Sequence, residues 1–110
     1  MPKAKISALG CYTPPRVLTN QDLEKLVDTN DQWIMERTGI RERHIADPEM
    51  ATSDMAILAA RCALAQRGIE ATEIDAIIVC TVTPDHFFPS TACLVQEAGV
   101  IEVSGFAAIA

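Results

Sequence analysis

One stretch decides the fold class of this chain: residues 76–82 read Ala-Ile-Ile-Val-Cys-Thr-Val. Its apolar residues follow one another instead of alternating with polar ones. A strand that is covered on one face alternates, whereas a strand inside a parallel sheet is covered on both faces and is apolar throughout. The sequence therefore predicts a strand at Ala76–Val82, covered on both faces, in a parallel sheet of an α/β protein.

The segment before this strand predicts the longest helix of the chain. Residues Ser53–Arg67 have apolar side chains at helical spacing, Thr52 or Ser53 is available as the N-cap, and Gly68 follows the last turn. Four alanines lie within Ala56–Ala63. Their small side chains allow a neighbouring segment to approach this helix closely.

The segment after the strand completes the α/β pattern. A helix that Ser90 or Thr91 caps and Gly99 stops is followed by a second apolar stretch at Val103–Ala110. Two strands joined through a helix form a parallel crossover. We therefore expect Val103–Ala110 to lie beside Ala76–Val82 in one sheet, with the helix over one face.

The first half of the chain contains shorter elements. Expected there are a strand at Lys5–Tyr12, helices at 21–27 and 31–37, and an exposed strand at 41–46. The sequence Thr13-Pro14-Pro15 ends the first strand, because proline and the residue before it disfavour regular pairing, and it leads into a loop. Asn30 can cap the second helix, and Gly39 is suited to its end.

Composition and charge restrict the class of protein. The chain has 110 residues with 9 basic and 15 acidic side chains, a net charge of −6, so one small domain or part of a larger one is expected. The acidic balance disfavours nucleic-acid and anionic-membrane binders. No apolar run suggests a membrane span or a secretion signal, so we expect a cytoplasmic protein with reduced thiols. No metal site is expected, since the spacing of Cys80, His86 and Cys93 fits no zinc pattern.

A motif in the first half of the chain points to a family. Residues 28–45 read DTNDQWIMERTGIRERHI, and the pattern D-x-W-I-x-x-R-T-G-I-R-x-R within them resembles β-ketoacyl-acyl carrier protein synthase III, a condensing enzyme of the thiolase fold. Leu9–Pro14, Thr19–Glu24, Ile77–Thr81 and Thr83–Ala92 support the resemblance. It covers residues 3 to about 97, which match the opening part of such an enzyme.

The resemblance implies both an architecture and a reaction. The architecture is the layered αβαβα thiolase fold in a homodimer, and residues 1–110 would form only part of its N-terminal half. The reaction is an acyl transfer that condenses an acyl-CoA primer with malonyl-acyl carrier protein, yields β-ketoacyl-carrier protein and CO₂, and starts fatty-acid synthesis. Acyl-CoA is then a substrate, and no cofactor is expected.

The family's catalytic cysteine, histidine and asparagine have no counterpart among these residues. The chain stops at Ala110, before the expected position of the nucleophile. No catalytic residue is therefore assigned, and the 110 residues by themselves are expected to be inactive. Two alternatives stay open: a related thiolase-fold acyltransferase of secondary metabolism, and a non-catalytic chain that keeps binding or dimer-forming surfaces.

The resemblance also assigns a binding site for the nucleotide of CoA. Trp33 and Arg37 would enclose the adenine, and Thr29 would hydrogen-bond its edge. Residues four apart share one face of a helix, and an aromatic ring with a planar guanidinium can enclose a base, so spacing and chemistry agree. Without the resemblance, Trp33, the one tryptophan of the chain, reads as a half-buried anchor of the helix.

Four further residues are assigned to other parts of the site. Phe88 matches a residue that closes the acyl pocket of the partner subunit, and the alternative is a ring packed within its own subunit. Arg16, Arg41 and Arg43 are candidate contacts for phosphates or for the carrier protein. The alternative for these arginines is surface charge balanced by nearby glutamates. His44 and His86 are expected to be structural or surface residues.

Overall fold

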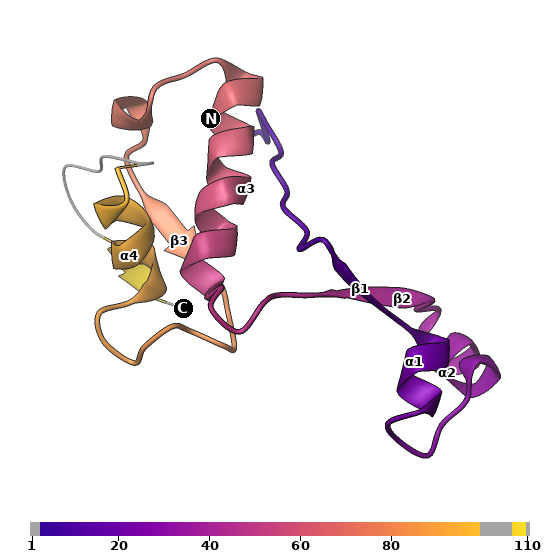
Figure 1. The fold of residues 1–110 in the computed structure, drawn as a ribbon. Helices are drawn as coiled ribbons and strands as arrows, with labels where there is room; N and C mark the ends of the chain where they lie inside the picture. The colour runs from indigo at the N-terminus through magenta and orange to yellow at the C-terminus, as the bar shows by residue number, and fades with distance from the viewer. Residues whose placement is uncertain (1–2, 100–106, 110) are drawn as a thin grey trace. The chain divides into compact units, whose positions relative to one another are not determined.

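The computed structural model describes residues 3–99 and 107–109 (Figure 1). The chain divides into two compact units, one formed by Thr13–Glu49 and the other by Met1–Tyr12 with Met50–Ala110. Among the described residues, none of the helices has both the length and the apolar character needed to cross a membrane. These described residues also contain no group of three or more His, Cys, Asp or Glu side chains that could hold a metal ion.

The unit Thr13–Glu49 is an antiparallel strand pair with two short helices inserted between its strands. β1 (Arg16–Thr19) pairs with β2 (Glu42–Ile45), and Thr19 stands opposite Glu42. α1 (Asn20–Glu24) follows β1 directly, and α2 (Asp31–Thr38) returns the chain toward β2. Figure 1 shows both helices at the same end of the strand pair.

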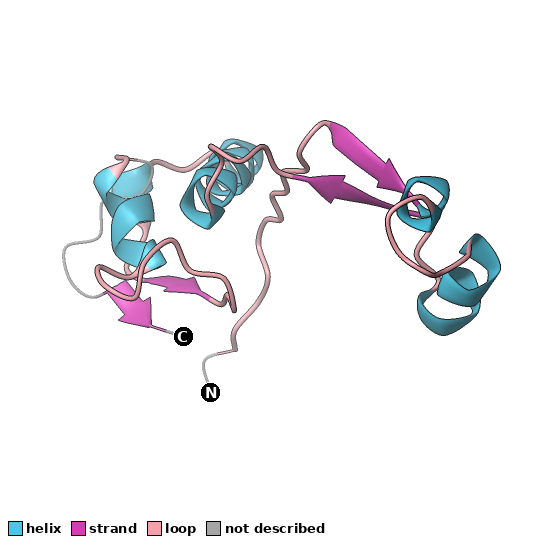
Figure 2. Cartoon of the chain, turned by 60° about the horizontal axis from the view of Figure 1, so that its bottom comes forward, coloured by secondary structure: helices cyan, strands magenta, loops and turns pink. Residues whose placement is uncertain are grey.

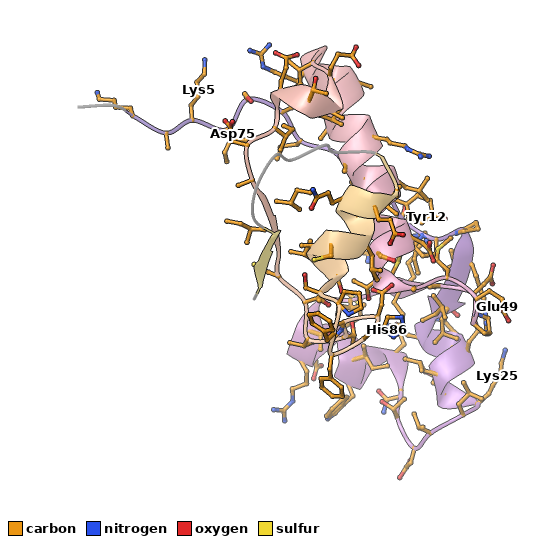
Figure 3. The ribbon with its side chains drawn as sticks, turned by 90° about the vertical axis from the view of Figure 1, so that its left-hand side faces the viewer. Lys5, Tyr12, Lys25, Glu49, Asp75 and His86 are labelled. Carbon is orange, nitrogen blue, oxygen red and sulfur yellow. The ribbon has the colours of Figure 1, made fainter. Side chains whose placement is uncertain are left out.

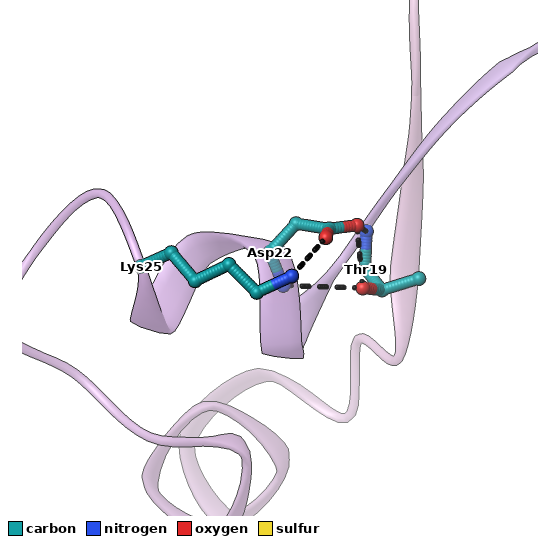
Figure 4. A network of polar contacts seen from close by, with 3 residues as sticks. All are labelled: Thr19, Asp22 and Lys25. Carbon is teal, nitrogen blue, oxygen red and sulfur yellow. Dashed lines mark hydrogen bonds and ion pairs between the residues drawn. The ribbon is translucent and has the colours of Figure 1, made fainter.

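α1 begins in a capping box formed by Thr19 and Asp22. Thr19 Oγ1 accepts from Asp22 N at 3.2 Å, and Asp22 Oδ2 accepts from Thr19 N at 3.2 Å (Figure 4). Lys25 Nζ lies 3.1 Å from Asp22 Oδ1. The hydrogen bonds from Thr19 and then from Lys25 lower the pKa of Asp22 to about 2. The helix ends at Glu24 instead of about Val27. Lys25 N donates to Asp22 O at 3.3 Å, and both Leu26 N and Val27 N donate to Leu23 O.

The second unit contains the parallel sheet. Its elements are α3 (Thr52–Arg67), the 3₁₀ turn η1 (Ala71–Glu73), β3 (Ile77–Val79), α4 (Thr91–Glu97) and β4 (Ala107–Ile109). β3 and β4 pair in parallel, with Ile77 opposite Ala107 (Figure 2). The predicted strand pair is thus confirmed over these residues, while 100–106 and 110 lie outside the described residues.

The core of this unit lies where α4 packs on β3. Ile77, Ala92 and Val95 are buried, and partly buried side chains of α3 pack against them. Ile78, the next residue of β3, is 69% exposed. Successive side chains point to opposite faces, and the core lies on the face of Ile77, so the described residues cover only one of the two faces that the sequence predicts to be covered.

The stretch Lys5–Tyr12 forms no strand, so that prediction is wrong. It lies against α3 instead: Leu9 N donates to Gln66 Oε1 at 2.7 Å, and a Cβ added at Gly10 would lie 2.1 Å from Ala59 O. A strand requires a neighbouring strand to pair with its backbone, and this stretch packs on a helix. The alanine face of α3 allows the close approach that its sequence predicts.

Candidate functional site

The helix α2 forms as its sequence predicts. Asn30 Oδ1 accepts from Trp33 N at 2.8 Å and caps the helix. Gly39, at a φ of +69°, ends it, and its N–H donates to Met35 O at 2.9 Å. A second acceptor stands at the start, where Glu24 Oε1 accepts from Asp31 N at 2.7 Å. Both ends of α2 are therefore set by polar contacts.

Trp33 and Arg37 lie together on the exposed face of α2. Arg37 Cζ is 5.8 Å from the centroid of the Trp33 ring, which is within the range of a cation–π contact. Trp33 is 54% exposed, whereas the neighbouring Ile34 is buried. Ile34 thus anchors the helix, and the tryptophan ring is available to a ligand.

Arg37 is an exposed side chain, and its guanidinium lies over the Trp33 ring in this structure. Thr29 is half-buried and precedes the cap residue Asn30, so the three predicted residues follow one another at four-residue intervals.

The three candidate arginines occupy different surroundings. Arg16 is exposed and lies on β1, not in the expected loop. Arg41 is exposed and lines an open pocket of about 380 Å³ together with Thr19, Gln21, Asp31, Met35 and Glu42. Arg43 is half-buried, and its Nη1 donates to Asn20 Oδ1 at 2.9 Å and to Leu18 O at 3.5 Å. Arg43 thus contributes to the interior of its unit.

A loop before α4 carries two exposed aromatic rings. Phe87 and Phe88 are 105% and 90% exposed. The start of this loop is held by Asp85, whose Oδ1 accepts from Ser53 N at 3.0 Å and from Thr91 Oγ1 at 3.3 Å. The carboxylate therefore joins the first turns of α3 and α4, as expected for an anion at helix N-termini.

The pKa of Asp85 reflects two opposing effects. Burial raises it, but hydrogen bonds from Ser53 and Thr91 lower it by more, so that the pKa lies below its ordinary value. Sequence reasoning did not identify Asp85, and a Pro-Asp pair before a capped helix is the signal that could have suggested it.

The two histidines belong to different units. His44 Nδ1 makes a polar contact with Pro14 O within its unit. His86 is exposed in the loop that leads into α4 (Figure 3).

Comparison with known proteins shows close relatives along almost the whole chain. It is 92% identical over 98 residues to a β-ketoacyl-[acyl-carrier-protein] synthase III of Solibacter usitatus, covering 89% of this chain and 30% of that protein. It is 62% identical over 105 residues to the same-named protein of Koribacter versatilis, covering 94% of this chain and 32% of that protein. No family model matches the chain.

Solved structures agree with these relatives. The crystal structure of 3-oxoacyl-[acyl-carrier-protein] synthase III from Aquifex aeolicus matches with a TM-score of 0.85 and 50% identity, over 96% of this chain and 34% of that one. The priming β-ketosynthase of the R1128 polyketide pathway matches with a TM-score of 0.83 and 33% identity, over 96% of this chain and 32% of that one. The chain thus spans about a third of its relatives, and the predicted thiolase-like α/β fold is confirmed for this part.

Proposed function

Since this chain belongs to the β-ketoacyl-acyl carrier protein synthase III family, we propose that the complete protein condenses an acyl-CoA primer with malonyl-acyl carrier protein. The products are CO₂ and the β-ketoacyl-carrier protein that starts fatty-acid synthesis. The alternative in secondary metabolism has weaker support, because the polyketide relative is 33% identical whereas the synthase III of Solibacter usitatus is 92% identical.

In this reaction the described residues bind substrate and take no part in the bond-making steps. Trp33 and Arg37 enclose the adenine of CoA, and Thr29 hydrogen-bonds its edge. The observation that carries this proposal is the exposed ring of Trp33 with the Arg37 guanidinium 5.8 Å from its centroid. Stacking needs such an accessible aromatic face, and a guanidinium can cover the opposite side of a base.

The phosphates and the carrier protein need cations near the nucleotide. Arg16 and Arg41 are exposed and can meet these anionic groups. Arg43 is the weaker candidate, since one of its nitrogens already donates inside the unit.

The loop that carries Phe88 supports a homodimer. Val82, Phe87 and Phe88 are each at least 90% exposed in this chain, and exposed aromatic clusters favour association with a partner surface. We place the Phe88 ring at the acyl pocket of a second subunit, where its bulk favours short primers. We further expect a cytoplasmic enzyme that takes CoA thioesters as substrates and needs no bound cofactor.

Replacing Trp33 by alanine in the complete protein tests the nucleotide site. Stacking on an aromatic face contributes roughly 1–3 kcal/mol, so the KM for acyl-CoA should rise about tenfold. The kcat should change little, because this contact is equal in ground and transition states. Leu26→Ala is the matched control, since it truncates an apolar side chain of the same unit that is 70% exposed. An unchanged KM with a collapsed kcat would contradict the proposal.

A further inference from the structure

We propose that Asn20 is a positioning residue for the nucleotide of acyl-CoA: its buried amide holds both ends of α2 and thereby sets the direction of the Trp33–Arg37 face. This inference rests on the proposed function, because it concerns how the same binding surface is held in place. Asn20 itself does not belong to that surface, since its side chain is fully buried.

The amide nitrogen of Asn20 makes the two contacts to α2. Its Nδ2 donates to Asp31 Oδ1 at 2.6 Å and to Ile40 O at 2.9 Å. Asp31 is the first residue of α2, and Ile40 follows the glycine that ends the helix. One NH₂ group therefore contacts the beginning of the helix and the chain just beyond its end.

The amide oxygen of Asn20 connects these contacts with α2 to the strand pair. Its Oδ1 accepts from Arg43 Nη1 at 2.9 Å, and Arg43 lies on β2. The backbone of Asn20 is also fixed, because its N–H donates to Arg41 O at 3.3 Å. The side-chain amide of Asn20 is thus hydrogen-bonded through both its nitrogen and its oxygen. Buried polar groups that are fully hydrogen-bonded make a structure rigid.

The helix α2 depends on such contacts because few others orient it: the hydrogen bond from Asp31 N to Glu24 Oε1 at 2.7 Å holds only its start. It has eight residues, of which only Ile34 is buried. A helix of this length is unstable by itself, and one apolar side chain leaves its rotation weakly determined. Trp33 and Arg37 project from the exposed side, so a small tilt of α2 would displace both from a bound base.

The test is Asn20→Asp in the complete protein. Aspartate keeps the size of the side chain and the acceptor for Arg43, but it loses both N–H donors and faces the carboxylate of Asp31. The double variant Asn20→Asp/Asp31→Asn reverses donor and acceptor and restores that hydrogen bond. Gln66→Glu is the matched control, because it makes the same amide-to-carboxylate change at an exposed residue whose Oε1 can still accept from Leu9 N.

Each variant is assayed with two acyl donors: acetyl-CoA, and an acetyl-pantetheine thioester that lacks the nucleotide. We expect Asn20→Asp to raise the KM for acetyl-CoA about fivefold, equivalent to about 1 kcal/mol, with little change in kcat. The kcat/KM for the thioester without the nucleotide should stay at the wild-type value. The double variant should recover much of the loss, and Gln66→Glu should behave as wild type.

Two results would overturn the role of Asn20. An unchanged KM for acetyl-CoA would show that the amide does not position α2, and an equal loss with both donors would show a general structural defect. The variant Trp33→Ala distinguishes a failure of the Asn20 proposal from a failure of the proposed function. If Trp33→Ala raises the KM and Asn20→Asp does not, only the role of Asn20 is wrong, whereas an unchanged KM in Trp33→Ala refutes the nucleotide site itself.

Discussion

Replacing Gly10 by alanine should disturb the packing of the N-terminal segment on α3. A Cβ at this position would lie 2.1 Å from Ala59 O and 2.5 Å from Ala63 N, whereas ordinary contacts begin at 3.4 Å. Both atoms belong to the helix backbone and cannot rotate away, so the segment must move outward by about 1 Å or more. Such overpacking costs about 3 kcal/mol, at the upper end of its usual range.

A smaller effect on the unfolded chain acts in the opposite direction. Alanine restricts the unfolded backbone more than glycine does, which stabilises the folded state by about 0.5 kcal/mol. We therefore expect Gly10→Ala to lower the free energy of unfolding by about 2–3 kcal/mol. Urea denaturation of the complete protein, followed by far-ultraviolet circular dichroism, measures this as a lower midpoint.

Two comparisons identify the backbone contact as the cause. Gly68→Ala should cost about 1 kcal/mol, because Gly68 has a φ of +69° but nothing within 4 Å of an added Cβ. Adding Ala63→Gly to Gly10→Ala should not restore stability, since it removes only the third contact, with Ala63 Cβ at 2.9 Å. Wild-type stability of Gly10→Ala, or full rescue by Ala63→Gly, would refute the reasoning.

Three further predictions concern the cap of α2, the Asp85 carboxylate between α3 and α4, and the loop that carries Phe88. Asn30→Ala removes the acceptor for Trp33 N and should lower the free energy of unfolding by about 1 kcal/mol, while Asn30→Asp should not; urea denaturation measures both. Burial raises the pKa of Asp85, but hydrogen bonds lower it by more. The ionised carboxylate therefore stabilises the fold fully when the pH is above the ordinary carboxyl pKa, and this stabilisation is lost as the pH falls through the lowered pKa of the folded state. As the pH is lowered, the melting temperature should therefore fall less steeply in Asp85→Asn than in wild type. An equal fall of the melting temperature in both proteins would contradict this. Phe88→Ala should weaken the proposed dimer of the complete protein in sedimentation equilibrium and leave the helix content unchanged, because the ring is 90% exposed in this chain. Equal association of wild type and variant would count against the proposed interface.

The helix ends that depend on neighbouring residues could be predicted closely. Asn30 and Ser90 cap α2 and α4, and Gly39 and Gly68 adopt the left-handed conformation after α2 and α3. Caps and C-terminal glycines act within about four residues. The four-residue spacing of Trp33 and Arg37 predicted for the same reason that both lie on one face of α2.

The start of α3 shows where this kind of prediction fails. Thr52 and Ser53 are good capping residues, yet the N-cap is Ala51. Thr52 Oγ1 donates to Thr83 O at 2.7 Å, and Ser53 binds Asp85, which lies 32 residues further along. Asp54 is a local carboxylate at this terminus and accepts from Ala51 N at 2.8 Å. The carboxylate that accepts from Ser53 comes from a distant loop, and no local pattern contains it.

The sequence by itself determined the α/β order, the pairing of the two apolar strands and the likeness to a condensing enzyme, because these follow from periodicity and from a contiguous motif. Only the tertiary structure decided that Lys5–Tyr12 packs on α3 and that Asn20 is a buried centre of hydrogen bonds. The partners of Asn20 stand 11, 20 and 23 residues away. Its role depends on which groups the folded chain brings within 3 Å, and in the sequence it reads as one more polar residue behind a helix cap.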